Sequence, residues 1–227
     1  MRLIRSATAE FVGTAFLVAA IIGSGIAAER LSPDDVGLQL LENSLATGAV
    51  LVALILALQP VSAAFIPIVT LVERSLGVVT SREAAVLVGA QIVGGGLGAV
   101  VEPDVRPVRD HALDQGPHRH RGRGRRNTGA GAVIFGTIRS VRPQMVAFAV
   151  GGYITAGYWF TSSTSFANPA VTFGRMFSDT FAGIEPGAVP VFVLMQLVGG
   201  LLAYGLVRLL YPDAARAVAE LTTREDR

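Results

Sequence analysis

Apolar residues are gathered into long runs along the chain, and they do not recur at the three- to four-residue spacing of a surface helix. Five runs carry almost no charge and approach the roughly 20 residues that a helix needs to cross a bilayer. They are Phe11–Ala28, Leu45–Phe65, Ala84–Val101, Met145–Trp159 and Gly187–Leu206. The pattern predicts an all-α membrane protein with at least five crossings.

Two short motifs each occur twice. "FIPIVTL" at Phe65–Leu71 aligns with "ANPAVTF" at Ala167–Phe173, 102 residues later. "QIVGGGLGA" at Gln91–Ala99 aligns with "QLVGGLLAY" at Gln196–Tyr204, 105 residues later. The two pairs come in the same order, which predicts a duplicated chain.

The repeat halves cover about 8–101 and 131–210, and each has room for three crossings. Because three is odd, the halves cross the membrane in opposite directions, as in the inverted repeats of many transporters and channels. The glycines alone have a simpler explanation, because close helix packing uses glycine in any membrane bundle. These glycines are Gly94, Gly95, Gly96, Gly98, Gly199 and Gly200.

Arginine residues alternate with the apolar runs in a way that predicts orientation. They precede the first run, lie between the second and the third, and follow the last. They also precede Met145–Trp159, which is the fifth crossing if a missing fourth one is counted. The residues are Arg2, Arg5, Arg74, Arg82, Arg139, Arg142, Arg208, Arg216, Arg224 and Arg227. The positive-inside rule is then met by an even number of crossings with both termini in the cytoplasm, which requires a sixth crossing.

The segment "NPAVTFGRMF" begins with a helix-starting signal. Asn168 is a good N-cap, and Pro169 suits the first helical position because its missing N–H had no partner there. About ten residues separate it from Ser178, too few to span a bilayer. We therefore expect a half-helix at midplane, whose positive N-terminus repels cations while the Asn168 amide donates to a passing oxygen.

These residues resemble the aquaporin, or major intrinsic protein, family. The resemblance lies in "AEFVGTAFLV" (Ala9–Val18), the altered box Ile66-Pro67-Ile68, the intact box Asn168-Pro169-Ala170 and the two Gln-x-x-Gly segments. It implies six tilted helices with two re-entrant half-helices, usually assembled as homotetramers with one pore per subunit. It also implies that Glu10 braces the loop before a half-helix.

The chain departs from the family pattern at the pore. Ile66 and Ile68 stand where the family has Asn and Ala, so one cap and one midplane donor are lost. Val171 stands where the family filter has Arg, and the family spacing assigns the other filter positions to Ala46, Ala156 and Ser165. The resemblance then implies a wide, uncharged, mostly apolar gate. Alternatively, Arg175, one helical turn further on, supplies the charge.

Segment 102–131 contains seven Arg and all three His, where the resemblance places a fourth helix. A compensated pair of frameshifts explains this composition, because a GC-rich gene read out of frame gives Pro/Arg/Gly/His-rich text. A genuine outer loop and a nucleic-acid-binding arm are the alternatives, and the outside placement argues against nucleic acid. If the chain is made as written, the fourth helix is absent or truncated.

Composition restricts the chemistry further. The chain has 51% hydrophobic residues, a mean hydropathy of +0.53 and no cysteine, and no acid–base or metal-type cluster falls outside segment 102–131. We expect no enzyme and no cofactor, but a single channel domain over 1–210 and a cytoplasmic tail over 211–227, in a bacterial inner membrane. The expected solutes are water and small neutral molecules such as glycerol. The alternatives are a facilitator of arsenite or methylated arsenicals and a non-conducting remnant.

Overall fold

The computed structural model describes residues 1–101, 145–161 and 164–210, and these residues contain helices and no strand. The expected fourth helix, the disrupted segment 102–131 and the tail 211–227 lie outside the described residues. The helices are α1 (Arg2–Leu31), α2 (Val36–Leu58), α3 (Pro67–Ser75), α4 (Ser81–Val100), α6 (Val146–Phe160), α7 (Pro169–Arg175), η3 (Pro186–Ala188) and α8 (Val189–Leu210).

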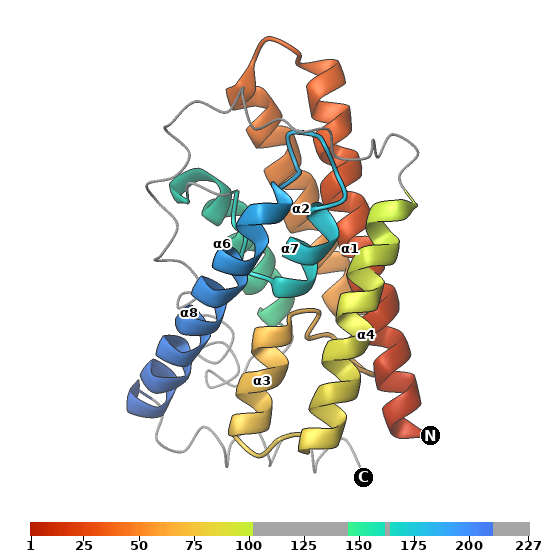
Figure 1. Cartoon of the computed structure of the whole chain (residues 1–227), viewed down its shortest axis with the longest axis vertical. Helices are drawn as coiled ribbons and strands as arrows, with labels where there is room; N and C mark the ends of the chain where they lie inside the picture. Colours follow the sequence, from red (N-terminus) through yellow and green to blue (C-terminus); the bar gives the residue numbers. More distant parts are fainter. Residues whose placement is uncertain (102–144, 162–163, 211–227) are drawn as a thin grey trace.

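Four helices in the described part are long and apolar enough to cross a membrane: α1, α2, α4 and α8, the last counted together with η3. The fifth, α6, is apolar but shorter. The all-α membrane fold is therefore confirmed. Short α3 and α7 lie in the middle of the bundle between these long helices, as expected of two half-helices (Figure 1).

The predicted bounds of the second crossing were wrong. The hydropathy run suggested Leu45–Phe65, but α2 spans Val36–Leu58. It starts early because the Asp35 side chain accepts the Leu38 N–H and caps the first turn. It ends early because Pro60 has no N–H to continue the helical ladder. The apolar residues after Pro60 belong to the loop that leads into α3.

Glycines of α4 and α8 bring these helices against the half-helices of the opposite repeat half. A Cβ at Gly95 would lie 2.5 Å from the Ala170 carbonyl oxygen, so α4 touches the backbone of α7 there. At Gly200, an added Cβ would collide with Ile68, so α8 meets α3 in the corresponding way. Each half thus packs its last long helix against the box of the other half.

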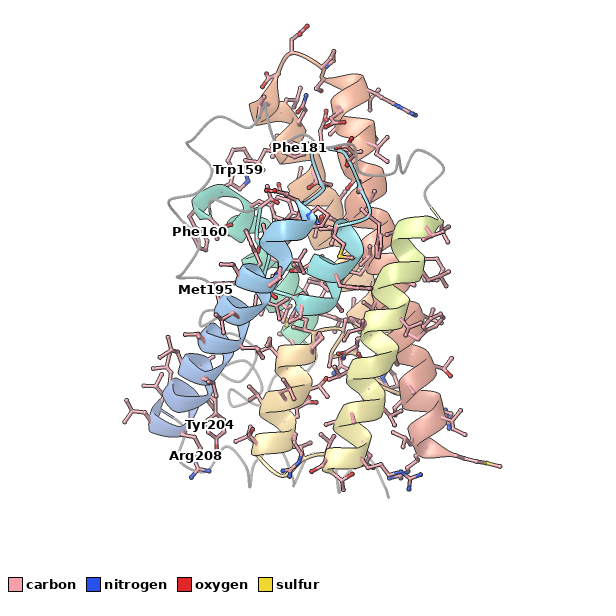
Figure 2. The ribbon with its side chains drawn as sticks, in the orientation of Figure 1. Trp159, Phe160, Phe181, Met195, Tyr204 and Arg208 are labelled. Atoms are coloured by element: carbon pink, nitrogen blue, oxygen red, sulfur yellow. The ribbon has the colours of Figure 1, made fainter. Side chains whose placement is uncertain are left out.

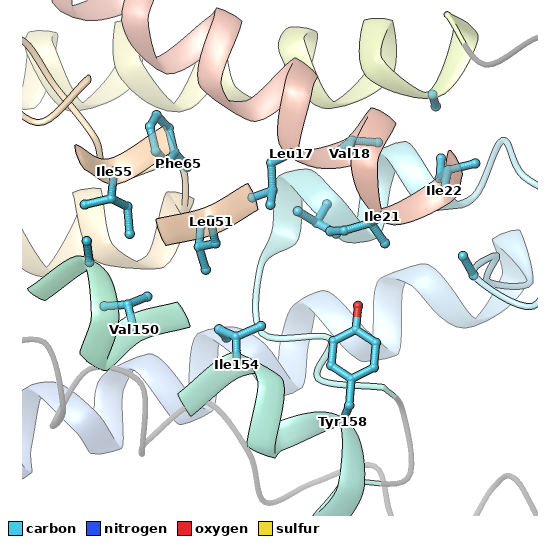
Figure 3. Packing of buried hydrophobic residues seen from close by; sticks show 14 of the residues in the cluster. Leu17, Val18, Ile21, Ile22, Leu51, Ile55, Phe65, Val150, Ile154 and Tyr158 are labelled. Carbon is cyan, nitrogen blue, oxygen red and sulfur yellow. The ribbon is translucent and has the colours of Figure 1, made fainter. Parts of the chain in front are cut away.

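The main apolar core lies between α1, α2 and α6 (Figure 3). It includes Leu17, Val18, Ile21, Ile22, Leu51, Ile55, Phe65, Val150, Ile154 and Tyr158. Phe65 is the one labelled residue that comes from a loop, and its ring occupies the space left by Gly13, where a Cβ would collide with it. The core therefore fixes the residue immediately before the altered box.

The two ends of the bundle differ in charge and in aromatic residues. The start of α1, the turn between α3 and α4 and the end of α8 lie at the same end (Figure 1). Figure 2 places Tyr204 and Arg208 at that end, and Trp159, Phe160 and Phe181 towards the other. Arg2, Arg5, Arg74 and Arg82 also belong to the basic end. Aromatic and basic residues of this kind mark membrane–water interfaces.

Candidate functional site at the half-helix junction

The N-termini of α3 and α7 meet inside the bundle. Asn168 is the N-cap of α7, and its Oδ1 accepts the N–H groups of Ala170 at 2.9 Å and Val171 at 3.3 Å. These bonds fix the amide, so its Nδ2 points away from α7 and donates to the Phe65 carbonyl at 2.6 Å. Asn168 is only 7% exposed. One side chain thus caps its own half-helix and ties it to the loop of the opposite half.

Ile66 holds the corresponding place at α3 with nearly the same backbone. Its φ and ψ are −133° and 111°, against −137° and 114° for Asn168. Its side chain makes no cap hydrogen bond, and Ile66 and Ile68 are both buried. The first box therefore keeps the shape of a capped helix start and lacks its polar group.

The carboxylate of Glu10 lies behind the loop that precedes α3, fully buried. Its Oε1 accepts the Ser62 hydroxyl and the Ala64 N–H, the latter at 2.9 Å. Its Oε2 accepts the Phe65 N–H at 2.7 Å and the Gln91 amide at 2.8 Å. All four partners are donors, which suits an acceptor-only carboxylate. Phe65 needs this support because its φ of 50° is unfavourable for a bulky residue.

A glutamine and a threonine form the same latch in both halves. Gln91 on α4 donates to Thr70 on α3 at 3.1 Å, and Gln196 on α8 donates to Thr172 on α7 at 2.7 Å. All four residues are buried. In the sequence, both glutamines stand out only as markers of the repeat. The signal that could have found the latch is the recurrence of a Thr in each half-helix with a Gln 21 or 24 residues after it.

Two of the proposed filter residues, Ala46 and Ala156, lie on α2 and α6 near a contact between these helices. Thr47 Oγ1 and the Tyr158 hydroxyl lie 2.9 Å apart, which brings the adjacent parts of α2 and α6 to one level. Ala46 directly precedes Thr47 and is half-buried, whereas Ala156 comes two residues before Tyr158 and is exposed.

The other two proposed filter positions belong to α7 and its leading loop. Ser165 packs against Gly157 of α6, where a Cβ would come within 2.6 Å of Ser165 Oγ. Val171 is 5% exposed and belongs to the apolar core. The structure thus gives Val171 less open surface than the other three positions.

Arg175 ends α7 on the same face as Val171, four residues earlier, and is 2% exposed. Its Nε donates to the Ala182 carbonyl, and its Nη2 donates to Thr164 Oγ1 at 3.1 Å. The guanidinium also lies over the Phe166 ring, 3.9 Å from its centroid. Its contacts are therefore with the loops on both sides of α7.

The half-helix junction is distinct from an apolar hollow on the surface of the bundle. That hollow has a volume of about 450 Å³ and is lined only by residues of α1 and α4. They are Leu3, Ile4, Ala7, Thr8, Phe11 and Val86.

The sequence model of the major intrinsic protein family matches residues 1–118 and 126–226. The chain belongs to the major intrinsic protein family. The match is interrupted only within the Arg-rich segment.

Two known proteins illustrate the relationship. Aquaglyceroporin AqpS of Rhizobium meliloti (strain 1021) is 44% identical over 229 residues, covering 98% of this chain and 97% of that protein. The X-ray structure of the aquaglyceroporin from Plasmodium falciparum matches with a TM-score of 0.63 and 17% identity, covering 93% of this chain and 98% of that one. The second comparison supports the fold alone.

Proposed function

We propose that this member of the family is a passive pore for water and small neutral solutes such as glycerol. The observation that carries the proposal is the junction of two half-helix N-termini, joined by Asn168 and Phe65. Each N-terminus carries roughly half a positive charge, and together they oppose the entry of cations and protons. Asn168 has a second amide N–H, which we assign to the passing solute oxygen. Pro169 and Ala170 start the half-helix behind it.

The gate of this pore consists of Ala46, Ala156, Ser165 and Val171. None of the four is charged and none is large, so the gate offers a wide passage to a neutral solute. Ile66, Pro67 and Ile68 make the opposite wall at midplane apolar. These features, and a relative named an aquaglyceroporin, favour polyol-sized solutes over water alone.

The pore lies in the bacterial inner membrane with both termini in the cytoplasm. The basic residues at the α1 start, the α3–α4 turn and the α8 end support this orientation. Large apolar side chains remain exposed on the bundle, among them Phe16, Val93 and Leu201. They are suited to contact lipid or neighbouring copies, and we propose a homotetramer. No nucleic-acid partner is proposed.

The direct test is osmotic flux through the purified full chain in proteoliposomes. After a jump in external glycerol, vesicles with the protein first shrink and then reswell as glycerol enters, and light scattering follows both phases. We expect faster water and glycerol phases than in protein-free vesicles. Both phases at the lipid-only rate would contradict the channel and favour the non-conducting remnant.

A second candidate is a facilitator of neutral metalloid acids, arsenite and its methylated forms. The observation that favours it is Val171 in place of the filter arginine, because a gate without this charge admits bulkier uncharged molecules. Cells that express the chain should become more sensitive to external arsenite than cells carrying the empty vector. Unchanged sensitivity, with the protein present in the membrane, counts against this candidate.

The fourth helix is tested at the level of the gene, because residues 102–144 lie outside the described residues. We expect resequencing of codons 100–132 to reveal paired frameshifts and a restored apolar helix with a Glu. A gene that confirms the Arg-rich text would mean a broken fourth helix and little or no conduction.

A further inference from the structure

We propose that Arg175 is a positioning residue that sets the outer gate by holding Ser165. Arg175 does so from the last turn of α7, two turns beyond the half-helix junction. The inference rests on the proposed function, because it assigns to Ser165 a role in solute selection.

The Arg175 guanidinium contacts both neighbours of Ser165. It donates to Thr164 and lies over Phe166, the two residues that flank Ser165. A buried guanidinium needs partners for its N–H groups, and here a carbonyl and a hydroxyl accept two of them while an aromatic face lies against the cation. Ser165 is therefore held from both sides by one cation.

The backbone of Thr164 and Ser165 has an unfavourable conformation. Thr164 and Ser165 have φ values of 47° and 59°, a left-handed conformation that side-chain-bearing residues rarely adopt. Two such residues in succession persist only where the surroundings specify them. The Ser165 N–H donates to Thr161 Oγ1 at 2.8 Å, and Arg175 holds the neighbouring Thr164 hydroxyl. If Arg175 releases Thr164, this segment can relax and Ser165 moves with it.

On its other side, Arg175 is anchored to the loop that follows α7. Arg175 donates to Ala182, and this loop is itself fixed on α1. The Phe181 N–H donates to the Glu29 carboxylate, and Ala182 packs against Gly25, where a Cβ would come within 2.6 Å. Figure 1 shows this loop rising from α7 along the upper part of α1. Arg175 therefore braces the gate against a fixed helix.

The equivalent position on α3 does not repeat the brace. The repeat offset pairs Arg175 with Glu73, an acidic residue. Among the described residues, the brace thus belongs only to the repeat half that contains α7. A cation at this position is not a general requirement of a half-helix.

The test compares permeabilities for glycerol and the larger erythritol in proteoliposomes at equal protein density. Arg175→Lys keeps the charge but loses the fork that reaches Thr164 and Ala182 together. We expect the glycerol-to-erythritol ratio to fall by about threefold or more, comparable to the loss of one hydrogen bond. Arg74→Lys is the matched control, because Arg74 lies in the last turn of the other half-helix at an exposed site. This control should leave the ratio unchanged.

A second pair of variants tests the same contact from its other end. Thr164→Val removes the hydroxyl and keeps the shape, whereas Thr164→Ser keeps the hydroxyl. We expect Thr164→Val to shift the ratio in the same direction as Arg175→Lys, Thr164→Ser to retain it, and the double variant to show no further shift.

The outcomes separate this inference from the proposed function. A purely structural role for Arg175 would lower both permeabilities in proportion, and an unchanged ratio in a conducting Thr164→Val variant would overturn the inference alone. If Arg175→Lys does not assemble, Thr164→Val decides. A wild-type chain that leaves the vesicles at the lipid-only rate overturns the proposed function, and this inference with it.

Discussion

Replacing Glu10 by glutamine changes one atom of a side chain that accepts four hydrogen bonds. An amide has one acceptor oxygen, so the new side chain would satisfy Phe65 and Gln91 on one side while its NH₂ faces Ser62 and Ala64 on the other. The Ser62 hydroxyl can rotate and accept, but the Ala64 N–H cannot. One buried backbone donor therefore loses its partner, and the remaining bonds lose the help of a full charge.

The magnitude follows from these losses. An orphaned buried donor costs about 1–3 kcal/mol, and each bond that loses its charged acceptor weakens by about 1 kcal/mol. We expect Glu10→Gln to lower the free energy of unfolding by about 3–5 kcal/mol. We also expect slower glycerol flux, because the Phe65 carbonyl that receives Asn168 belongs to the loosened loop.

The assay is SDS unfolding of the full chain in mixed micelles, followed by circular dichroism, with proteoliposome flux alongside. Glu83→Gln is the matched control, because Glu83 is only partly buried at the start of α4 and Gln also completes a capping box. The control should stay within about 0.5 kcal/mol of wild type. A Glu10→Gln variant as stable as this control would refute the argument that the carboxylate holds the loop.

Three further substitutions test the junction and the gate. Gly95→Ala should destabilise the chain by about 1–3 kcal/mol in the same unfolding assay, because the new Cβ would collide with the Ala170 carbonyl. Gly89→Ala is the control, since a Cβ there meets open space, and it should be neutral or stabilising. Equal effects of the two variants would contradict the packing argument. Ile66→Asn should stabilise by about 0.5–2 kcal/mol and speed the water phase, since the backbone there already has the conformation of a capped start; a loss of stability would show that the apolar side chain matters more than the cap. Val171→Arg should lower glycerol permeability relative to water by about tenfold, equivalent to roughly 1.4 kcal/mol of added barrier, and an unchanged ratio would remove Val171 from the gate.

Sequence was sufficient wherever the relevant chemistry is local. Asn-Pro-Ala specifies a helix start through a side-chain cap and a proline at the first position, and α7 begins at Pro169. The repeat offset correctly paired it with a second short helix at Pro67. The bounds of α2 failed because hydropathy does not distinguish a buried apolar loop, such as the one that ends at Phe65, from a membrane-spanning helix.

The rest of the site depends on contacts between distant residues. The recurrence of a Thr and a Gln in both halves does not by itself show that each Gln reaches the threonine of its own half-helix. The Arg175 brace depends on left-handed Thr164 and Ser165, and neither is a residue type that signals this conformation. The sequence showed only that Arg175 lies one helical turn after Val171, and it did not predict which residues Arg175 contacts.

The bond between Asn168 and Phe65 has a kinetic consequence. Carriers built from inverted repeats work by alternating access, in which one half rocks against the other around a central site. Here the two halves are pinned to each other at that centre by a buried hydrogen bond, and again by Gly95 against Ala170 and Gly200 against Ile68. A turnover cycle would have to break these contacts at every step. The arrangement instead favours a fixed passage, whose rate rises in proportion to the solute gradient and shows no saturation.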